Sequence, residues 1–330
     1  MKLPRHTAII AGVIAILIMP LFVTDSYILH LMILSMIFAV AAASWDITIG
    51  YCGLFNFAHM TFFGIAAYTS AILSTTYGIT PWITMPIGAL SAVLASLVVG
   101  LPSLRLGGVY VAMFGLAFLQ VVGFIYLFDP FNLTHGPNGI QLVPPLSIGP
   151  ISFGGLNKIP NYYYTLILLA ISAMALYKLV KSPVGLALQA IRDNENYAMS
   201  RGISPYKFKI IAWVVSAFFS GLAGAFYPHY NGVVSLETLG FSLVALTLSY
   251  LVVGGMGTIF GPILGAFFMT FVSEQLRGLA GYRFLVVAVA VILVVALAKG
   301  GLADLITRLF KALQPKTTLA KKGIDNGTDT

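Results

Sequence analysis

The stretch YILHLMILSMIFAVAAASW at residues 27–45 decides the class of fold, because it contains no Asp, Glu, Lys or Arg. A helix that crosses a membrane needs about 20 mostly apolar residues, since each residue rises about 1.5 Å through about 30 Å of hydrocarbon. Similar uncharged runs occupy residues 7–23, 77–104, 106–128, 162–177 and 210–235. The chain of 330 residues is 59% hydrophobic and only 8% charged, whereas soluble domains carry about 25% charged residues. A soluble domain is therefore excluded, and the sequence predicts an all-α integral membrane protein.

The uncharged runs predict a polytopic bundle of about ten transmembrane helices. The expected spans are residues 7–23, 27–47, 57–76, 81–101, 107–128, 162–180, 209–227, 241–256, 260–277 and 283–299. They belong to one transmembrane domain of residues 1–313, with a cytoplasmic loop at about 181–209 and an outer loop at about 129–161. Residues 302–313 have one apolar helical face, which is typical of an interfacial helix, and the polar residues 314–330 predict a disordered cytoplasmic tail.

The net charge of +8 predicts the orientation of the spans. Basic residues cluster in the connection 178–209 and near the C-terminal end at 299–322, whereas the connection 129–161 contains one, Lys158. Lys and Arg accumulate in cytoplasmic loops, so an even number of spans places both termini and the 178–209 connection in the cytoplasm. No soluble domain is left to bind nucleic acid. The expected partner of the apolar surface is a lipid bilayer.

Two clusters of glycine interrupt the apolar runs. Gly50 and Gly53 precede the third expected span, while Gly254, Gly255 and Gly257 separate the eighth from the ninth. Irregular backbone at membrane depth is tolerated only inside protein or beside a water-filled cavity. Both clusters are therefore candidates for a translocation path, and residues 50–60 are candidates for a re-entrant segment. For the second cluster, a tight turn at the membrane surface is an equal alternative.

Small residues at four-residue spacing predict close approach of several helices. Three stripes have this spacing: Gly88, Ala92, Ser96 and Gly100; Ser216, Ser220 and Gly224; Gly257, Gly261 and Gly265. Such stripes let helix backbones pack tightly in lipid, where no hydrophobic effect drives association. They favour a multi-helix bundle without indicating a function.

The connection SPVGLALQAIRDNENYAMSRGISP at residues 182–205 predicts one amphipathic helix outside the membrane. Ser182 is a good N-cap, Pro183 suits the first helical position, and Gly202 suits the residue after the last turn. A plain turn between two spans would need only a few residues, so the helix is a candidate for binding a partner outside the membrane. A helix that lies on lipid is the alternative.

Four segments carry a family resemblance, and they occur in order along the chain. They are GYCGLFNFAHMTFFGIAAYTSAIL at 50–73, HGPNGI at 135–140, SPVGLALQAIRDNENYAMSRGISPYKFKIIAWVVSAFFSGLAGAFY at 182–227 and LVVGGMGTIFGPILGAFF at 251–268. Together they resemble the permeases of ATP-binding-cassette (ABC) importers for branched-chain amino acids, in particular the longer, M-type (LivM-like) member of the permease pair. The resemblance covers about residues 28–302.

The resemblance implies a set of partners and a coupling helix. Permeases of this family pair with a second homologous permease subunit, bind two cytoplasmic ATPase subunits, and receive amino acid from a periplasmic substrate-binding protein. Carried onto this chain, the residues of the helix that would dock on an ATPase are Gly185, Ala190, Arg192, Asp193, Asn194, Glu195 and Gly202.

The chain carries no nucleotide site of its own. It has no G-x-x-x-x-G-K-[ST] sequence and no Gly-Lys pair, so a phosphate-binding loop with its lysine is missing. The chain is expected to be a transport subunit rather than an enzyme. It needs no cofactor itself, and ATP and Mg belong to the partner subunits.

Three polar residues in apolar surroundings are further candidates for the translocation path. Asp46 follows Trp45 near the end of the second expected span; it either sits at the inner interface, the favoured interpretation, or contacts the amine of a substrate. Asn56 and His59 lie in the first glycine-rich segment, where hydrogen bonding between helices is an equally good explanation. No spacing of His, Cys, Asp or Glu indicates a metal site.

The sequence leaves two alternatives to import of leucine, isoleucine and valine. The same architecture could import urea, short amides or other small solutes, and residue patterns do not separate these substrates. An ion-coupled secondary transporter or channel is the alternative of another class. It predicts paired acids inside the membrane and no partner-docking helix, and the expected helix between Ser182 and Gly202 argues against it.

Overall fold

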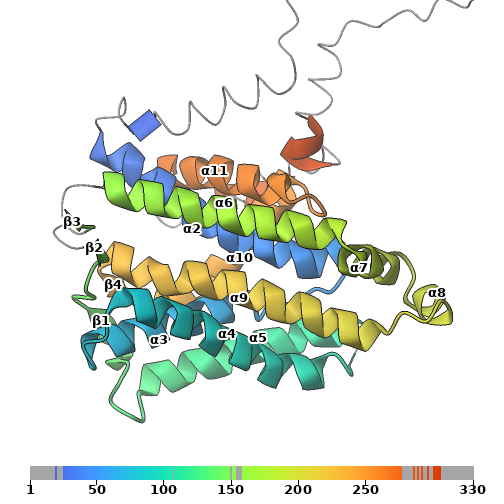
Figure 1. Cartoon of the computed structure of the whole chain (residues 1–330), viewed down its shortest axis with the longest axis horizontal. Helices are drawn as coiled ribbons and strands as arrows, with labels where there is room; N and C mark the ends of the chain where they lie inside the picture. The colour runs from blue at the N-terminus through green and yellow to red at the C-terminus, as the bar shows by residue number, and fades with distance from the viewer. Residues whose placement is uncertain are drawn as a thin grey trace, which may run out of the picture.

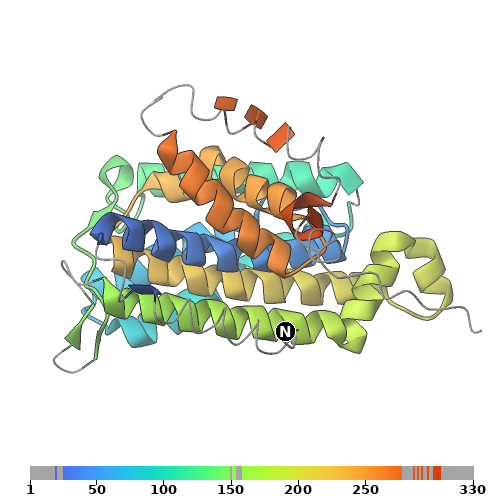
Figure 2. The same ribbon diagram turned by 90° about the horizontal axis from the view of Figure 1, so that it is seen from above.

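The computed structural model describes residues 19–20, 25–106, 108–148, 151–153, 158–276 and 300–305, with isolated positions between 285 and 296. Its long helices lie side by side in a single bundle, with their axes roughly parallel (Figure 1, Figure 2). The bundle helices are α2 (Ser26–Asp46), α3 (His59–Thr75), α4 (Pro81–Ser103), α5 (Gly108–Phe128), α6 (Ile159–Lys181), α9 (Pro205–Asn231), α10 (Phe241–Gly254) and α11 (Phe260–Gln275). The smaller elements are η1 (Ile47–Tyr51), η2 (Gly136–Asn138), η3 (Leu236–Leu239), α7 (Pro183–Asp193), α8 (Glu195–Ser200), β1 (Ile140–Gln141), β2 (Ser147–Ile148), β3 (Ile151–Ser152) and β4 (Val233–Val234).

Five helices of the described part are long and apolar enough to cross a membrane: α2 with η1, α4, α5, α6 and α9. The helices α3, α10 and α11 are shorter, and with the first five they match the second to ninth expected spans. The expected spans 7–23 and 283–299 lie outside the described residues, apart from isolated positions of the second. Residues 301–305 are helical, while the rest of the expected interfacial helix 302–313 and the tail 314–330 also lie outside. The count of about ten helices stays a prediction.

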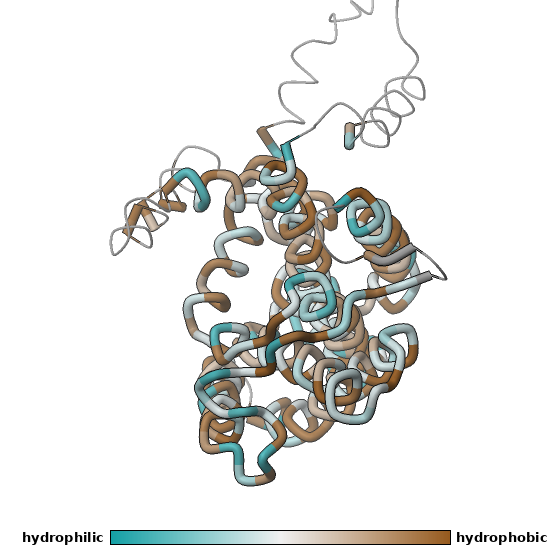
Figure 3. Tube along the Cα trace, turned by 90° about the vertical axis from the view of Figure 1, so that its left-hand side faces the viewer, coloured by the Kyte–Doolittle hydropathy of each residue, from teal (hydrophilic) through white to brown (hydrophobic). Residues whose placement is uncertain are grey.

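The bundle has two distinct ends. At one end, here the β-strand end, β1 pairs antiparallel with β4, and β2 pairs with β3. At the other, the α7–α8 end, α7 and α8 extend beyond the bundle (Figure 1, Figure 2). Figure 3 looks onto the β-strand end, where hydrophilic residues gather in the connections between largely hydrophobic helices.

The predicted small-residue stripes bring α3, α4 and α9 into close contact. A Cβ atom added to Gly88 of α4 would lie 2.8 Å from the carbonyl oxygen of Ala66 in α3, and one added to Gly221 of α9 would lie 2.7 Å from Ala92 Cβ. A Cβ at Gly224 would overlap the backbone of Phe63. The expectation of tightly packed helices is thus confirmed for the first two stripes, and most of α3 is buried in the bundle.

Two segments that lie outside the α-helices enter the bundle, and they differ in part from the two predicted glycine clusters. The first, residues 52–58, follows η1 and delays the start of α3 until His59, which bonds the carbonyl of Ala41 well inside α2. The second is the segment 235–240, whose Leu239 packs against Gly64 of α3. Gly64 lies eleven residues before the end of α3. At a rise of 1.5 Å per residue, this is about 16 Å along the helix axis from that end. The short helix α10 therefore begins at depth and ends at the α7–α8 end.

Candidate functional site

The connection between α6 and α9 forms two helices instead of the single one predicted. Asn194 has an extended backbone (φ −161°, ψ 106°) that ends α7, and its side-chain oxygen accepts a hydrogen bond from Tyr197 N, which starts α8. An Asn side chain that caps the next turn competes with continuation of the helix. Ser182 occupies the predicted N-cap position of α7, but its hydroxyl donates to Leu179 O in α6 instead of accepting a bond from α7. Gly202 has φ +81°, as expected for a residue that ends a helix.

One face of α7 packs on the bundle and the other faces away from it. Gly185, Leu188 and Ile191 are buried, and a Cβ at Gly185 would overlap the backbone of Val180 in α6. Ala190 is partly buried, whereas Leu186 is 63% exposed. The hydrophobic face thus attaches α7 to the bundle and leaves Leu186 free on the outer face.

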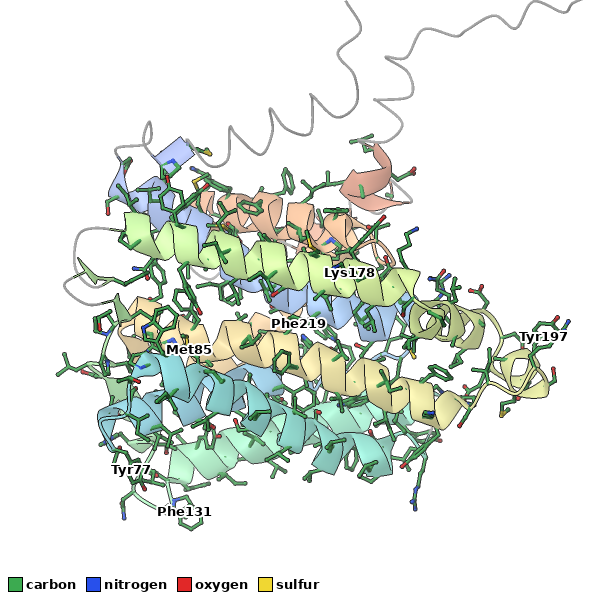
Figure 4. The ribbon with its side chains drawn as sticks, in the orientation of Figure 1. Tyr77, Met85, Phe131, Lys178, Tyr197 and Phe219 are labelled. Carbon is green, nitrogen blue, oxygen red and sulfur yellow. The ribbon has the colours of Figure 1, made fainter. Side chains whose placement is uncertain are left out.

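A salt bridge ties α8 to the long helix α9. Lys209 Nζ lies 2.7 Å from Glu195 Oε1, with the lysine side chain largely buried and the glutamate half exposed. At the far tip of α8, Tyr197 is 58% exposed and bonded through its hydroxyl to Arg201 (Figure 4). The salt bridge therefore anchors α8 to α9, and the Tyr197 side chain remains exposed on α8.

Arg192, predicted to belong to the docking helix, points partly back toward the bundle. Its Nη1 donates to Gly50 O at 2.8 Å, while Nη2 lies 3.1 Å from Asp193 Oδ1 on the surface. A Cβ added to Gly53 would lie 2.9 Å from Arg192 Cγ. The absence of a side chain at Gly53 is what lets the arginine reach the end of α2.

Asp46 is the last residue of α2 and is fully buried within the described protein, while its expected position at the inner interface stays a prediction. Both carboxylate oxygens accept hydrogen bonds from Gly257 N, at 2.9 and 3.0 Å, and Asp46 is 0% exposed. A buried charge needs bonded partners. The backbone N–H supplied by the turn after α10, and the nearby Arg192 guanidinium, which attracts the carboxylate, meet that need.

The two glycine clusters of the sequence meet at this carboxylate. A Cβ at Gly50 would overlap both Asp46 Oδ1 and Gly257 N, and Gly257 itself has φ +77°. The cluster of Gly254, Gly255 and Gly257 lies in the tight turn between α10 and α11, while its place at the membrane surface or in a translocation path stays a prediction. We call the contact of Asp46, Gly50, Arg192 and Gly257 the junction, because it joins α2, α7 and the α10–α11 turn. Sequence spacing gave no signal for this meeting of segments 211 residues apart.

Asn56 and His59 lie away from the junction. His59 is fully buried and stacks on Trp45 with ring centroids 5.2 Å apart. Its Nε2 bonds Ala41 O at 3.0 Å, and its Nδ1 bonds Ser216 Oγ of α9 at 3.0 Å. These contacts match the predicted alternative of hydrogen bonding between helices. Asn56 accepts a bond from Ala58 N, while its Nδ2 has no partner in the described part of the chain.

Charge is divided unequally between the two ends of the described structure. The α7–α8 end carries Arg105, Lys178, Lys181, Arg192, Arg201, Lys207 and Lys209, and the connections of the β-strand end carry Lys158. At the β-strand end the acid Asp129 organises the loop after α5 by accepting bonds from the backbone N–H groups of Leu133, Thr134 and His135. Desolvation acts to raise the pKa of Asp129, but these bonds, led by Thr134, hold it below the ordinary value of 3.8.

The β-strand end also contains two cavities. One, of about 370 Å³, lies between the end of α3 and the predicted outer-loop motif at residues 135–140. The other, of about 360 Å³, lies between His30, Lys158 and the end of α9. Among the residues that the structure describes, no group of three His, Cys, Asp or Glu side chains is placed to hold a metal ion.

Comparison with known proteins identifies relatives over most of the chain. The model of the family described as "Branched-chain amino acid transport system / permease component" matches residues 27–297. The high-affinity branched-chain amino acid transport system permease protein LivM of Escherichia coli is 31% identical over 290 residues, covering 82% of this chain and 68% of LivM. The guanosine ABC transporter permease protein NupQ of Bacillus subtilis is 26% identical over 214 residues, covering 59% and 60% of the two chains. No solved structure matches.

Proposed function

The chain belongs to the family of permease components of branched-chain amino acid transport systems, and we propose that it carries leucine, isoleucine and valine through the membrane as one subunit of an ABC importer. The match of the family model to residues 27–297 is the observation that carries this proposal. A permease of this family is a transport subunit. In the proposed complex, a second homologous permease, two cytoplasmic ATPases and a periplasmic binding protein complete the importer, and ATP and Mg bind to the ATPases.

The proposed orientation places the α7–α8 end in the cytoplasm. Seven basic side chains lie in the described part of that end, against one in the connections of the β-strand end, and the positive-inside rule assigns such an excess to the cytoplasm. Two further spans, at about residues 7–23 and 283–299, would bring the total to about ten. Both termini would then lie in the cytoplasm, and the membrane would be the bacterial inner membrane.

The proposed role of α7 and α8 is to receive force from the ATPases. Leu186, Tyr197 and Met199 are exposed apolar side chains on the α7–α8 projection, at 63%, 58% and 49%. Exposed apolar side chains that project beyond the bundle suit a groove in a partner protein. Arg192 would serve a different purpose from the one predicted, because its bond to Gly50 transmits movement of α7 to α2 and, through Asp46, to the α10–α11 turn.

The test is uptake by the complete reconstituted complex, with labelled leucine, isoleucine, valine and urea supplied in parallel. ATP-dependent uptake of the three amino acids and not of urea supports the proposal. Uptake of urea alone would favour the alternative substrate class. Transport by the isolated chain without ATPases would favour an ion-coupled transporter or channel instead.

A second test addresses the orientation. A cysteine placed at Tyr197 in a Cys52→Ala background is expected to react with a membrane-impermeant thiol reagent only in inside-out vesicles. A cysteine at Phe131, which is 76% exposed at the opposite end (Figure 4), is the matched control and should react only in right-side-out vesicles. The reverse pattern would refute the coupling role of α7 and α8.

A further inference from the structure

The seam between α3 and α5 holds buried polar atoms that have no partner within the described protein. We propose that this seam is the track along which the ammonium and carboxylate groups of the transported amino acid bind, an inference that rests on the proposed function. The α3–α5 seam is defined by Asn56, Thr61 and Tyr68 on one side and by the face of α5 that contains Gly115, Leu119, Val122 and the partly buried Tyr126 on the other.

The unpaired atoms are concentrated at this seam. Six buried side-chain polar atoms lack a hydrogen-bond partner in the described structure, and three of them are Asn56 Nδ2, Thr61 Oγ1 and Tyr68 Oη. Thr61 and Tyr68 are both 0% exposed. They lie seven residues apart and so project from nearly the same face of α3. Leaving a buried donor unpaired is costly, so a shared absence of partners along one face indicates a missing ligand.

The α3 side of the seam and α5 contact each other at two points along their length. A Cβ added to Gly115 of α5 would lie 2.8 Å from Ala58 N and 3.1 Å from Asn56 Oδ1. Further along, the rings of Tyr68 and Tyr126 lie 4.5 Å apart between centroids. The two contacts are about eleven residues apart on each helix, or about 16 Å. The seam thus covers about half of the 30 Å thickness of the hydrocarbon.

Both segments that enter the bundle outside the α-helices, residues 52–58 and 235–240, reach this seam. The first segment supplies Asn56 at one end of it, and the second supplies Leu239, which packs on Gly64 between Thr61 and Tyr68. Broken helices at membrane depth are typical of substrate sites in transporters, because irregular backbone is tolerated only where it is enclosed or lines a path.

The chemistry of the seam suits a small zwitterion with an apolar side chain. Asn56 Nδ2 can donate to a carboxylate, and the hydroxyls of Thr61 and Tyr68 can donate to a carboxylate or accept from an ammonium group. Neither α3 nor α5 contains Asp, Glu, Lys or Arg, so no fixed charge would hold the solute too tightly to leave. The buried Leu119 and Val122 of α5 supply apolar surface for a branched side chain.

The seam is closed in this structure, and α5 is the helix whose movement would open it. Only Val111, Ala112, Gly115, Leu119 and Val122 of α5 are fully buried. Most of the remaining surface of α5 is exposed in this chain. A helix attached along one narrow stripe can separate from α3 with the loss of few contacts.

Two substitutions test the track by removing the unpaired hydroxyls without changing side-chain shape. Thr61→Val and Tyr68→Phe are each expected to raise the KM for leucine uptake by the complete complex about 3- to 10-fold, the effect of one lost hydrogen bond. Because the atoms are unpaired within the protein, expression and thermal stability should be unchanged or improved. Ser172→Ala and Ser220→Ala are matched controls, since their hydroxyls are also buried and unpaired but lie on α6 and α9. The controls should leave KM unchanged.

An unchanged KM in both seam variants would overturn the track and leave the proposed function intact. A wild-type complex that takes up none of the three amino acids would overturn the function, and thiol labelling would then decide the seam. In a Cys52→Ala background, a Thr61→Cys variant should react with methanethiosulfonate ethylammonium during ATP turnover, whereas Ser172→Cys should not. Absence of reaction at position 61 under turnover would show that the seam does not open.

Discussion

Removal of the Arg192 side-chain donors should loosen α7 from the end of α2. In Arg192→Met the side chain keeps its apolar stem but loses the 2.8 Å bond from Nη1 to Gly50 O. A bond from a charged donor contributes about 1.5–3 kcal/mol. The Arg192 side chain is 40% exposed, so solvent screening favours the low end, about 1.5–2 kcal/mol. Local opening of α7 should therefore become about 10- to 30-fold more frequent.

Hydrogen exchange of the complete complex in lipid nanodiscs measures this opening. Amides within 183–193 should exchange about 10- to 30-fold faster in Arg192→Met than in the wild type. Lys178→Met is the matched control, because it removes an exposed positive charge from the neighbouring part of α6. Leucine transported per ATP hydrolysed should fall in the first variant and not in the second. Exchange within about 3-fold of wild type in Arg192→Met would refute the role assigned to this bond.

Three further perturbations test other parts of the structure. Gly50→Ala should prevent accumulation of folded protein, because the added Cβ would overlap Asp46 and Gly257 at the junction. Gly78→Ala is the control: the space around Gly78 is open, so this variant should lose only about 1–2 kcal/mol from its left-handed backbone conformation. The amount of each variant found in the membrane distinguishes the two outcomes. Asp129 has a lowered pKa, so its stabilisation of the loop after α5 is complete above pH 3.8 and is lost as the pH falls through the folded-state value. Protease protection of that loop should therefore disappear in acid, and Asp129→Asn should lack the protection already at neutral pH. Lys209→Met should speed hydrogen exchange of the α8 amides by no more than about 5-fold, because a salt bridge to the half-exposed Glu195 stabilises α8 by about 1 kcal/mol or less. A change in the exchange of the α5 amides would contradict this local effect.

The sequence by itself determined the class of fold, the family and the eight helices that the structure describes between residues 26 and 275. Uncharged runs such as 27–45 dictate helices because every backbone group in lipid must be bonded within its own segment. The C-terminal ends of α4, α5 and α6 were also predictable, because a charged or Gly- and Pro-containing connection follows each uncharged run. Small-residue spacing also predicted close approach between helices, and the structure shows which helices meet, α4 with α9 among them.

Only the tertiary structure decided which residues meet. Helices inside a membrane bundle are apolar on all sides, so periodicity does not distinguish the face that packs on a neighbour from the face that meets lipid. The contact of Asp46 with the N–H of Gly257 left no pattern in the sequence, because this partner lies 211 residues away and belongs to the backbone. The inward reach of Arg192 was equally invisible, because it depends on where α7 lies against α2, and that position follows from three-dimensional packing rather than from local sequence. The break at Asn194 has a local cause, the cap that its side chain forms on Tyr197 N.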